Sequence, residues 1–83
     1  MKKVRMYRNS RAEMSVEQLD EYYVVHMDRS YSLDLMKKVY SDYKSKPLMA
    51  CIPTGSKINR IARLFGELVM TSGQMNIYHI KGD

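Results

Sequence analysis

Residues 53–57, with the sequence PTGSK, combine the residue types that bind a phosphate group at the start of a helix. Backbone N–H groups and the helix dipole attract an anion there, and a glycine allows the anion to approach the backbone closely. The segment has a single glycine and its lysine follows a serine, so it lacks the G-x-x-x-x-G-K-[ST] spacing of a nucleotide-binding P-loop. It predicts either an anion site at Thr54, Gly55, Ser56 and Lys57 or simply a capped helix start.

A second candidate surface combines basic and aromatic residues on a predicted sheet. If Val4 and Met6 face the core, the alternation of a strand places their neighbours on the opposite side of the sheet. Tyrosines that stack on bases, beside cations that hold phosphates, are typical of proteins that bind single-stranded nucleic acid. The alternative is an ordinary half-buried sheet or a protein interface, where tyrosines are also common. The residues expected on this surface are Lys3, Arg5, Tyr7, Tyr22, His26, Asn76 and Tyr78.

Two predicted helices each carry basic residues on the face away from the core. These are Lys37, Lys38 and Lys44 on the first helix and Lys57, Arg60 and Arg63 on the second. Side by side, the two rows would form one stripe that binds nucleic acid or an acidic protein surface. The alternative is that both faces are merely solvated.

No combination of residues predicts catalysis. His26 and His79 lie in predicted strands, without the close carboxylate or cysteine partner that a metal site or a nucleophile requires. The carboxylates of Glu17, Asp20 and Glu21 are close in sequence but do not have metal-ligand spacing, and Cys51 lies in an apolar run that buries it. We therefore expect a protein that is not an enzyme and has no metal or cofactor.

The composition is that of one small globular domain with a basic surface. The chain has 83 residues and a net charge of +5, which favours acidic partners and nucleic acid first. Residues 1–11 and 37–63 are basic, whereas residues 13–34 are acidic. A single cysteine excludes an internal disulfide and suits the cytoplasm. No apolar run is long enough to cross a membrane, and no apolar segment follows the basic N-terminus as in a secretory signal.

Alternation and helical periodicity predict the elements that position these residues. Strands are expected at 2–8, 22–27, 48–52 and 74–80, although 22–27 also has helical spacing. A helix capped by Ser32 has an apolar face made by Leu35, Met36, Val39, Tyr40 and Tyr43. A second helix begins near Thr54 or Ser56 and continues to Gly73, with Gly66 inside it where a neighbouring backbone approaches closely. A short helix or an irregular loop is expected at 16–21.

These elements predict a single α/β domain that spans residues 1–83. Residues 1–14 form a basic N-terminal strand and loop, and residues 22–80 form two consecutive βαβ units with parallel strands. The expected sheet has four strands, is mostly parallel or mixed, and pairs the N-terminal strand with the strand at 22–27. The alternative is a ferredoxin-like split βαβ arrangement of the α+β class.

The resulting hypothesis is a small cytoplasmic binding protein that contacts nucleic acid through its basic and tyrosine-rich surfaces. The alternative is a protein-interaction module, a small regulator or inhibitor that docks on a larger target through its acidic segment or exposed methionines and tyrosines. A third hypothesis is a regulatory domain that binds phosphate or a nucleotide at residues 54–57. A free edge strand would also allow two copies to pair as a homodimer.

Overall fold

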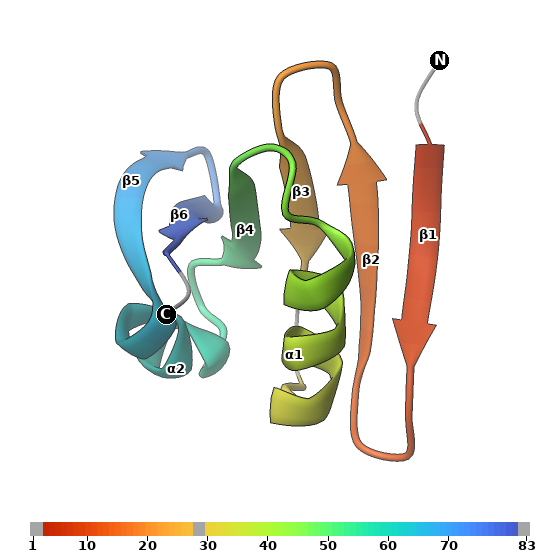
Figure 1. The fold of residues 1–83 in the computed structure, drawn as a ribbon. Helices are drawn as coiled ribbons and strands as arrows, with labels where there is room; N and C mark the ends of the chain where they lie inside the picture. The colour runs from red at the N-terminus through yellow and green to blue at the C-terminus, as the bar shows by residue number, and fades with distance from the viewer. Residues whose placement is uncertain (1–2, 28–29, 82–83) are drawn as a thin grey trace.

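The computed structural model describes residues 3–27 and 30–81, which form a six-stranded mixed sheet with two helices packed on one face (Figure 1). Along the chain the elements are β1 (Lys3–Arg8), β2 (Glu13–Gln18), β3 (Tyr23–His26), α1 (Leu33–Asp42), β4 (Leu48–Pro53), α2 (Ile58–Phe65), β5 (Gly66–Ser72) and β6 (Met75–Ile80). The strand order across the sheet is β1-β2-β3-β4-β6-β5. Lys2, which was included in the predicted first strand, lies outside the described residues.

The predicted α/β class fits this small α+β domain, but the prediction of four strands is wrong. The unit β3-α1-β4 is the expected βαβ unit, since β3 and β4 are parallel. The second unit is not, because β6 runs antiparallel to β4 after the chain has turned back through β5. The N-terminal strand β1 pairs with β2 rather than with β3. The element order also differs from the ferredoxin-like alternative, in which single strands and strand pairs alternate with the helices.

The first additional strand is β2, which replaces the helix or loop expected at 16–21. The side chain of Asn9 accepts hydrogen bonds from the backbone N–H groups of Arg11 and Ala12, both at 2.8 Å, and so closes a tight turn after β1. The returning chain alternates buried Met14 and Val16 with more exposed neighbours, the pattern of a strand packed on one face. The turn therefore determines this hairpin, and the helical spacing of Val16 is incidental.

The second additional strand is β5, which the sequence analysis assigned to the second half of a long helix. The helix α2 ends at Phe65, and Gly66 is extended with φ −144° and ψ 177°. A Cβ on Gly66 would lie 2.8 Å from the carbonyl oxygen of His79. The expected close backbone approach is therefore present, but it occurs between the strands β5 and β6 and not inside a helix. Gly73, with φ +62°, begins the two-residue loop between β5 and β6, as a tight hairpin turn requires.

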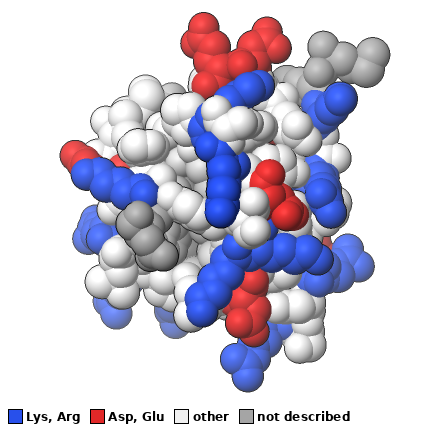
Figure 2. All heavy atoms as spheres, in the orientation of Figure 1, with Lys and Arg blue, Asp and Glu red and all other residues white. Residues whose placement is uncertain are grey.

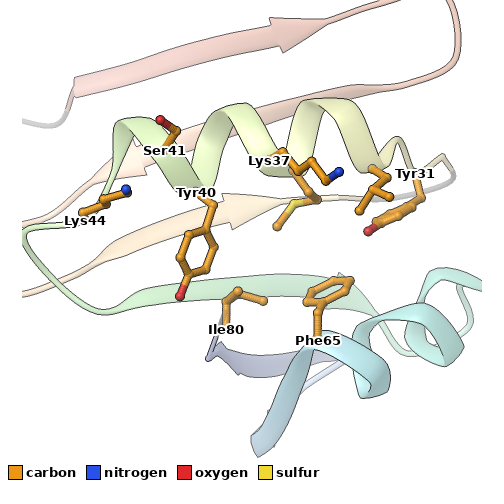
Figure 3. Close-up of a pocket in the computed structure, with 9 residues that line it drawn as sticks. Tyr31, Lys37, Tyr40, Ser41, Lys44, Phe65 and Ile80 are labelled. Carbon is orange, nitrogen blue, oxygen red and sulfur yellow. The ribbon is translucent and has the colours of Figure 1, made fainter. Parts of the chain in front are cut away.

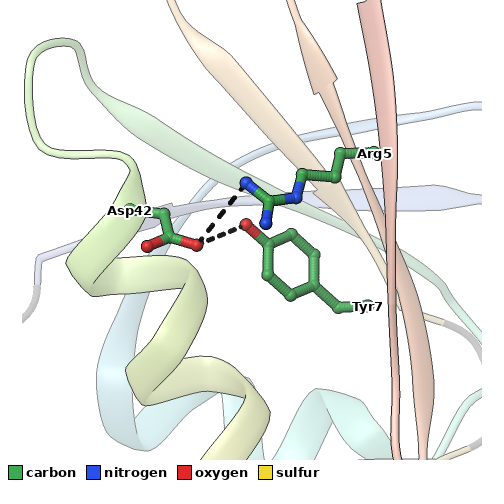
Figure 4. Close-up of polar contacts among 3 residues, drawn as sticks. All are labelled: Arg5, Tyr7 and Asp42. Carbon is green, nitrogen blue, oxygen red and sulfur yellow. Dashed lines mark hydrogen bonds and ion pairs between the residues drawn. The ribbon is translucent and has the colours of Figure 1, made fainter.

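The strand β1 presents the face opposite to the predicted one. Tyr7 is buried beneath α1, where its hydroxyl donates a 2.7 Å hydrogen bond to Asp42, and Arg5 lies above its ring (Figure 4). Val4 and Met6, expected in the core, are 59% and 54% exposed. Alternation alone does not say which side of a strand the helices cover, and here they cover the side with the amphipathic tyrosine.

The core lies between the helices and the sheet. It is formed by one side of every strand except β5, together with the inner faces of α1 and α2. The helix α1 has the predicted cap, because the Ser32 hydroxyl accepts a hydrogen bond from the backbone N–H of Leu35 at 3.4 Å. Leu68 and Val69, which fall within the predicted second helix, lie in β5 and are exposed, at 44% and 55%. None of the described helices is long and apolar enough to span a membrane.

Candidate nucleic-acid interface

A groove runs between α1 and the end of α2, with the C-terminal part of β6 as its floor (Figure 3). Its volume is about 310 Å³. The chain reaches it from three separate segments, because α1 crosses the sheet beside β6 and α2 ends where β6 ends. The residues that line it are Tyr31, Leu33, Met36, Lys37, Tyr40, Ser41, Lys44, Phe65 and Ile80.

Three aromatic rings form the apolar walls of this groove. The rings of Tyr31 and Phe65 are stacked, with centroids 5.8 Å apart and an interplanar angle of 12°. Tyr40 extends from α1 across the groove, and its hydroxyl donates a 2.8 Å hydrogen bond to the carbonyl oxygen of Lys81 (Figure 3). All three rings are partly buried against the core, which fixes them in place while part of each ring remains accessible. Burial also raises the pKa of Tyr31, so its hydroxyl remains a neutral hydrogen-bond donor at physiological pH.

Two lysines stand on the α1 side of the groove. Lys37 lies on α1, and Lys44 follows two residues after the helix ends at Asp42. Both are exposed, and neither forms an ion pair within the described part of the chain. Two unpaired ammonium groups beside aromatic rings can hold an anion while an aromatic or apolar group enters the groove.

The surroundings of the groove are predominantly basic. Figure 2 shows lysine and arginine side chains distributed over this side of the molecule, with fewer acidic side chains between them. The helices, the loops that precede β4 and α2, and the helix-facing side of β1 contribute these residues. They are Lys3, Arg5, Lys37, Lys38, Lys44, Lys46, Lys57, Arg60 and Arg63. A long polyanion would therefore meet positive charge beyond the groove itself.

The predicted tyrosine surface on the open sheet does not exist. Tyr7 and Tyr78 are both buried on the helix-covered side of the sheet, and Tyr78 has no exposed surface. Asn76 shares that side, whereas His26 belongs to the opposite one. Arg5 remains near Tyr7, but its guanidinium lies 3.9 Å from the carboxylate of Asp42 and so is partly neutralised. Of the tyrosines expected to stack on bases, Tyr7 and Tyr78 therefore have structural roles, whereas Tyr22 is exposed.

The basic residues predicted on the helices are separated by the structure. Lys37 lines the groove, whereas Lys38, the next residue along α1, does not. Lys57, Arg60 and Arg63 are exposed on and just before α2, and they are also outside the groove lining. The structure thus brings Lys37 and Lys44 to the groove and leaves Lys38 and the predicted basic residues of the second helix outside its lining.

The predicted anion loop at 54–57 uses its polar groups internally. The backbone N–H of Thr54 donates to the carbonyl of Gln74, and that of Ser56 donates to the carbonyl of Pro53. The Ser56 hydroxyl accepts from the N–H of Ile58, so the first turn of α2 is capped from within the loop. These contacts engage the N–H groups of Thr54, Ser56 and Ile58, and they favour a helix start closed from within the loop over the phosphate cradle.

Asn59 explains why this loop has its shape. Its side-chain amide donates to the carbonyls of Pro53, Thr54 and Ser56 at 2.8, 3.2 and 2.8 Å. Its side-chain oxygen accepts from the amide of Asn76 at 3.0 Å and from the hydroxyl of Tyr78 at 2.7 Å. The side chain is buried, so this one amide joins the loop, α2 and β6. Asn59 was not among the residues singled out from the sequence, so this role was missed.

The residues considered for catalysis lie on the face of the sheet opposite to the helices. Contrary to expectation, His26 has a close carboxylate, because its Nε2 is 3.3 Å from Glu17. Cys51 is adjacent to His26 in the sheet register, but it is buried, and both burial and the charge of Glu17 raise the pKa of its thiol. A raised thiol pKa disfavours the nucleophilic thiolate. Among the described residues, no group of three or more histidine, cysteine, aspartate or glutamate side chains could hold a metal ion.

The aromatic residues of the groove were not selected from the sequence. Tyr40 was assigned to the apolar face of its helix, whereas Tyr31 and Phe65 were not singled out. One signal was available: Lys37, Tyr40 and Lys44 follow one another at intervals of three and four, the spacing of one side of a helix. No protein-family model, curated protein or solved structure matches this chain. Its function is therefore inferred from its own residues.

Proposed function

We propose that this protein is a non-catalytic, cytoplasmic binding protein that contacts single-stranded nucleic acid through the groove between α1 and α2. The observation that carries the proposal is the pair Lys37 and Lys44 beside the partly accessible rings of Tyr31, Tyr40 and Phe65. Phosphates bind lysines as point charges, and unstacked bases bind aromatic rings, so one strand satisfies both kinds of group at once. The single cysteine, buried and unpaired, supports the cytoplasmic location.

The basic surroundings support a polyanion rather than a small anion. The groove is short, whereas positively charged residues continue on both helices beyond it (Figure 2). Counterion release from several phosphates makes such binding strongly dependent on salt. The groove would hold one or two bases, and the outlying cations would add affinity without sequence preference.

The test is a salt titration of binding to a fluorescent single-stranded oligonucleotide, followed by fluorescence anisotropy. Each phosphate contact on a single strand contributes about 0.7 to the slope of log K against log salt. Loss of one contact therefore weakens binding about fivefold at roughly 0.1 M salt, because ten to the power 0.7 is about five. The variant K37Q/K44Q should lose about 25-fold and reduce the slope by about 1.4.

Lys38 provides the matched control, because it has the same charge, helix and exposure class but does not line the groove. K38Q should change affinity by less than about twofold, the effect of a diffuse charge. Tyr31 supplies a second pair: Y31L should weaken binding by about fivefold or more, whereas Y31F, which retains the ring, should not. Absence of binding by the unmodified protein at about 50 mM salt would refute the proposal, since basic surfaces bind most strongly there. If K37Q and K38Q reduced the affinity for the oligonucleotide equally, the binding site would be a diffuse basic stripe and not the groove.

The second candidate function is a protein-interaction module, a small regulator or inhibitor of a larger target. One observation favours it: the sheet face opposite to the helices exposes large apolar side chains, among them Val4, Met6 and Met70. Exposed methionines form an adaptable apolar surface. A pull-down from nuclease-treated host extract separates this candidate from the first. A partner retained by the unmodified protein and lost with M6D would support it, and a partner retained equally by both would contradict it.

A further inference from the structure

The face of the sheet that the helices do not cover, here named the open face, includes two rows of side chains that cross all six strands. A third and shorter row at one end contains Arg8, Glu13, Pro53, Met75 and Ser72. Residues paired in register point to the same side of a sheet, so the rows follow directly from the strand pairing. The first row is Val4, Glu17, Val24, Met49, His79 and Glu67. The second row is Met6, Ser15, His26, Cys51, Ile77 and Met70.

Apolar side chains dominate the open face, although no described part of the chain packs on it. Val4, Met6 and Met70 are between 52% and 59% exposed, and Val24 and Met49 near the centre are half-buried. A sheet of this kind ordinarily buries its apolar face against another layer. The helices supply such a layer on only one side, so the second apolar face has no covering layer among residues 3–27 and 30–81.

The charge of the open face is opposite to that of the rest of the molecule. Neither the first nor the second row contains a lysine or arginine, although the chain carries a net charge of +5. At the margins, Arg8 forms an ion pair with Glu13 at 3.0 Å, and Lys81 forms one with Glu67. The excess positive charge therefore lies elsewhere, mainly on the helix side. Nucleic acid and anionic membranes are not attracted to such a face, whereas an apolar protein surface is.

We propose that a second copy of this chain covers the open face, so that the two sheets stack as a β-sandwich. The two-fold axis would run along the strands between β3 and β4, which are the central pair in the order β1-β2-β3-β4-β6-β5. Rotation about this axis reverses each row and brings several complementary pairs together, although it also places Val4 opposite Glu67. Glu17 then lies opposite His79 of the other copy, and Val24 lies opposite Met49. In the second row, Met6 lies opposite Met70.

The arrangement also agrees with the general geometry of stacked sheets and with the charge distribution. Rotation about an axis along the strands keeps the strand directions of the two copies aligned, as in most β-sandwiches. The basic helix sides of the two copies then face outward, far apart, so the net charge of each copy does not oppose association. Both grooves remain accessible, and a dimer would present two of them.

The area of the open face is sufficient for a specific interface. Six strands spaced about 4.8 Å apart are about 29 Å wide, and six residues at about 3.3 Å each are about 20 Å long. Two such faces bury roughly 1,200 Å² in total, the lower limit of stable protein–protein interfaces. Antiparallel pairing of the whole of β1 through its free edge, by contrast, would place Lys3 of one copy opposite Arg8 of the other. Like charges directly opposite one another are destabilising, so stacking is favoured over edge pairing.

Sedimentation velocity of the full chain tests the proposal between about 1 and 100 μM, the range of dissociation constants for interfaces of modest size. The expected result is a concentration-dependent species with twice the chain mass of 9.8 kDa. The variant M6D should raise the dissociation constant at least tenfold, because it places a carboxylate against apolar surface. Met6 is already 54% exposed in the single chain, so the substitution leaves the core unchanged.

Two further variants separate the interface from unspecific association. L64D introduces the same charge at an apolar residue that is 86% exposed on α2, and it should leave the dimer unchanged. M70K alone should weaken the dimer, whereas the double variant M6D/M70K should restore it, because each aspartate then faces a lysine of the other copy. This rescue depends on the proposed axis and register.

Every outcome of these measurements supports or overturns a stated part of the proposal. If the chain is still a monomer at about 100 μM, a second copy does not cover the open face, and another protein becomes the candidate partner for this face. Equal weakening by M6D and L64D overturns the open face as the interface. Loss of the dimer in both single variants without rescue in the double variant overturns the axis. None of these results depends on nucleic-acid binding, which the groove variants test separately.

Discussion

The buried side chain of Asn59 allows a quantitative test of how the fold holds the β4–α2 loop against β6. Substitution by alanine removes three donor contacts to backbone carbonyls and two acceptor contacts. Thr54 lies in an exposed loop, so its carbonyl can bind water instead. The hydroxyl of Tyr78 cannot, because that residue has no exposed surface.

The expected loss of stability follows from these contacts. Leaving one buried group without a partner costs about 1–3 kcal/mol, and each further hydrogen bond is worth about 1 kcal/mol net. For N59A we therefore expect a decrease of about 3–4 kcal/mol in the free energy of unfolding. A domain of this size has only about 4–12 kcal/mol in total, so the change is large. Y78F removes one of the two acceptor contacts and should cost about 1 kcal/mol.

Urea unfolding followed by circular dichroism measures these differences. T71A is the control, because Thr71 donates to Asn76 at 2.7 Å in the same chain of hydrogen bonds but is exposed to water. It should cost less than about 0.5 kcal/mol. In a double-mutant cycle, N59A and Y78F should be non-additive, since both remove the same 2.7 Å bond. If N59A and T71A destabilised the protein equally, or if N59A and Y78F were strictly additive, Asn59 would not have the proposed role.

Two further predictions concern Tyr7 and the hairpin glycine. Burial and the hydrogen bond to Asp42 raise the pKa of Tyr7 above its ordinary value of 10.0, so the native state keeps a proton that the unfolded state loses. Stability should therefore be complete below pH 10 and fall above it, by up to about 1.4 kcal/mol per pH unit. Urea unfolding from pH 8 to 11 should show a shallower fall for Y7F, and equal slopes would contradict the assignment. Gly73 has φ +62°, so G73A should lower the free energy of unfolding by about 1–2 kcal/mol. Gly55 does not have a positive φ, and a Cβ there would meet no atom within 4 Å, so G55A should leave the stability nearly unchanged. Thermal unfolding compares the two, and similar melting temperatures would argue against a required left-handed turn.

Local sequence signals determined much of the fold. The helix α1 was predictable because Ser32 caps it and its apolar residues recur at helical spacing. The apolar run of β4 and the parallel pair β3–β4 followed from the length of the connection between them. The left-handed conformation of Gly73 and the close backbone approach at Gly66 were also expected from glycine chemistry.

Other elements depended on pairing between distant residues. Residues 66–72 have apolar side chains at positions compatible with either helix or strand, and pairing with β6 decided in favour of strand. The face of β1 was equally ambiguous, because Tyr7 and Met6 are both plausible core residues. The position of α1 decided it, through the contact between Tyr7 and Asp42.

For the candidate site, the sequence by itself determined which kinds of side chain are available for binding. The tertiary structure decided which of them lie together in the groove. Net positive charge, abundant tyrosines and lysines at helical spacing were visible from the start. Which rings meet which lysines was not, since Tyr31, Tyr40 and Phe65 come together only when α1 and α2 pack on the same face of the sheet. Likewise, the apolar character of alternate strand residues was visible in the sequence, but their exposure was not. Burial depends on how layers pack against one another, and only the assembled sheet shows that the described part of the chain leaves one of its two apolar faces uncovered.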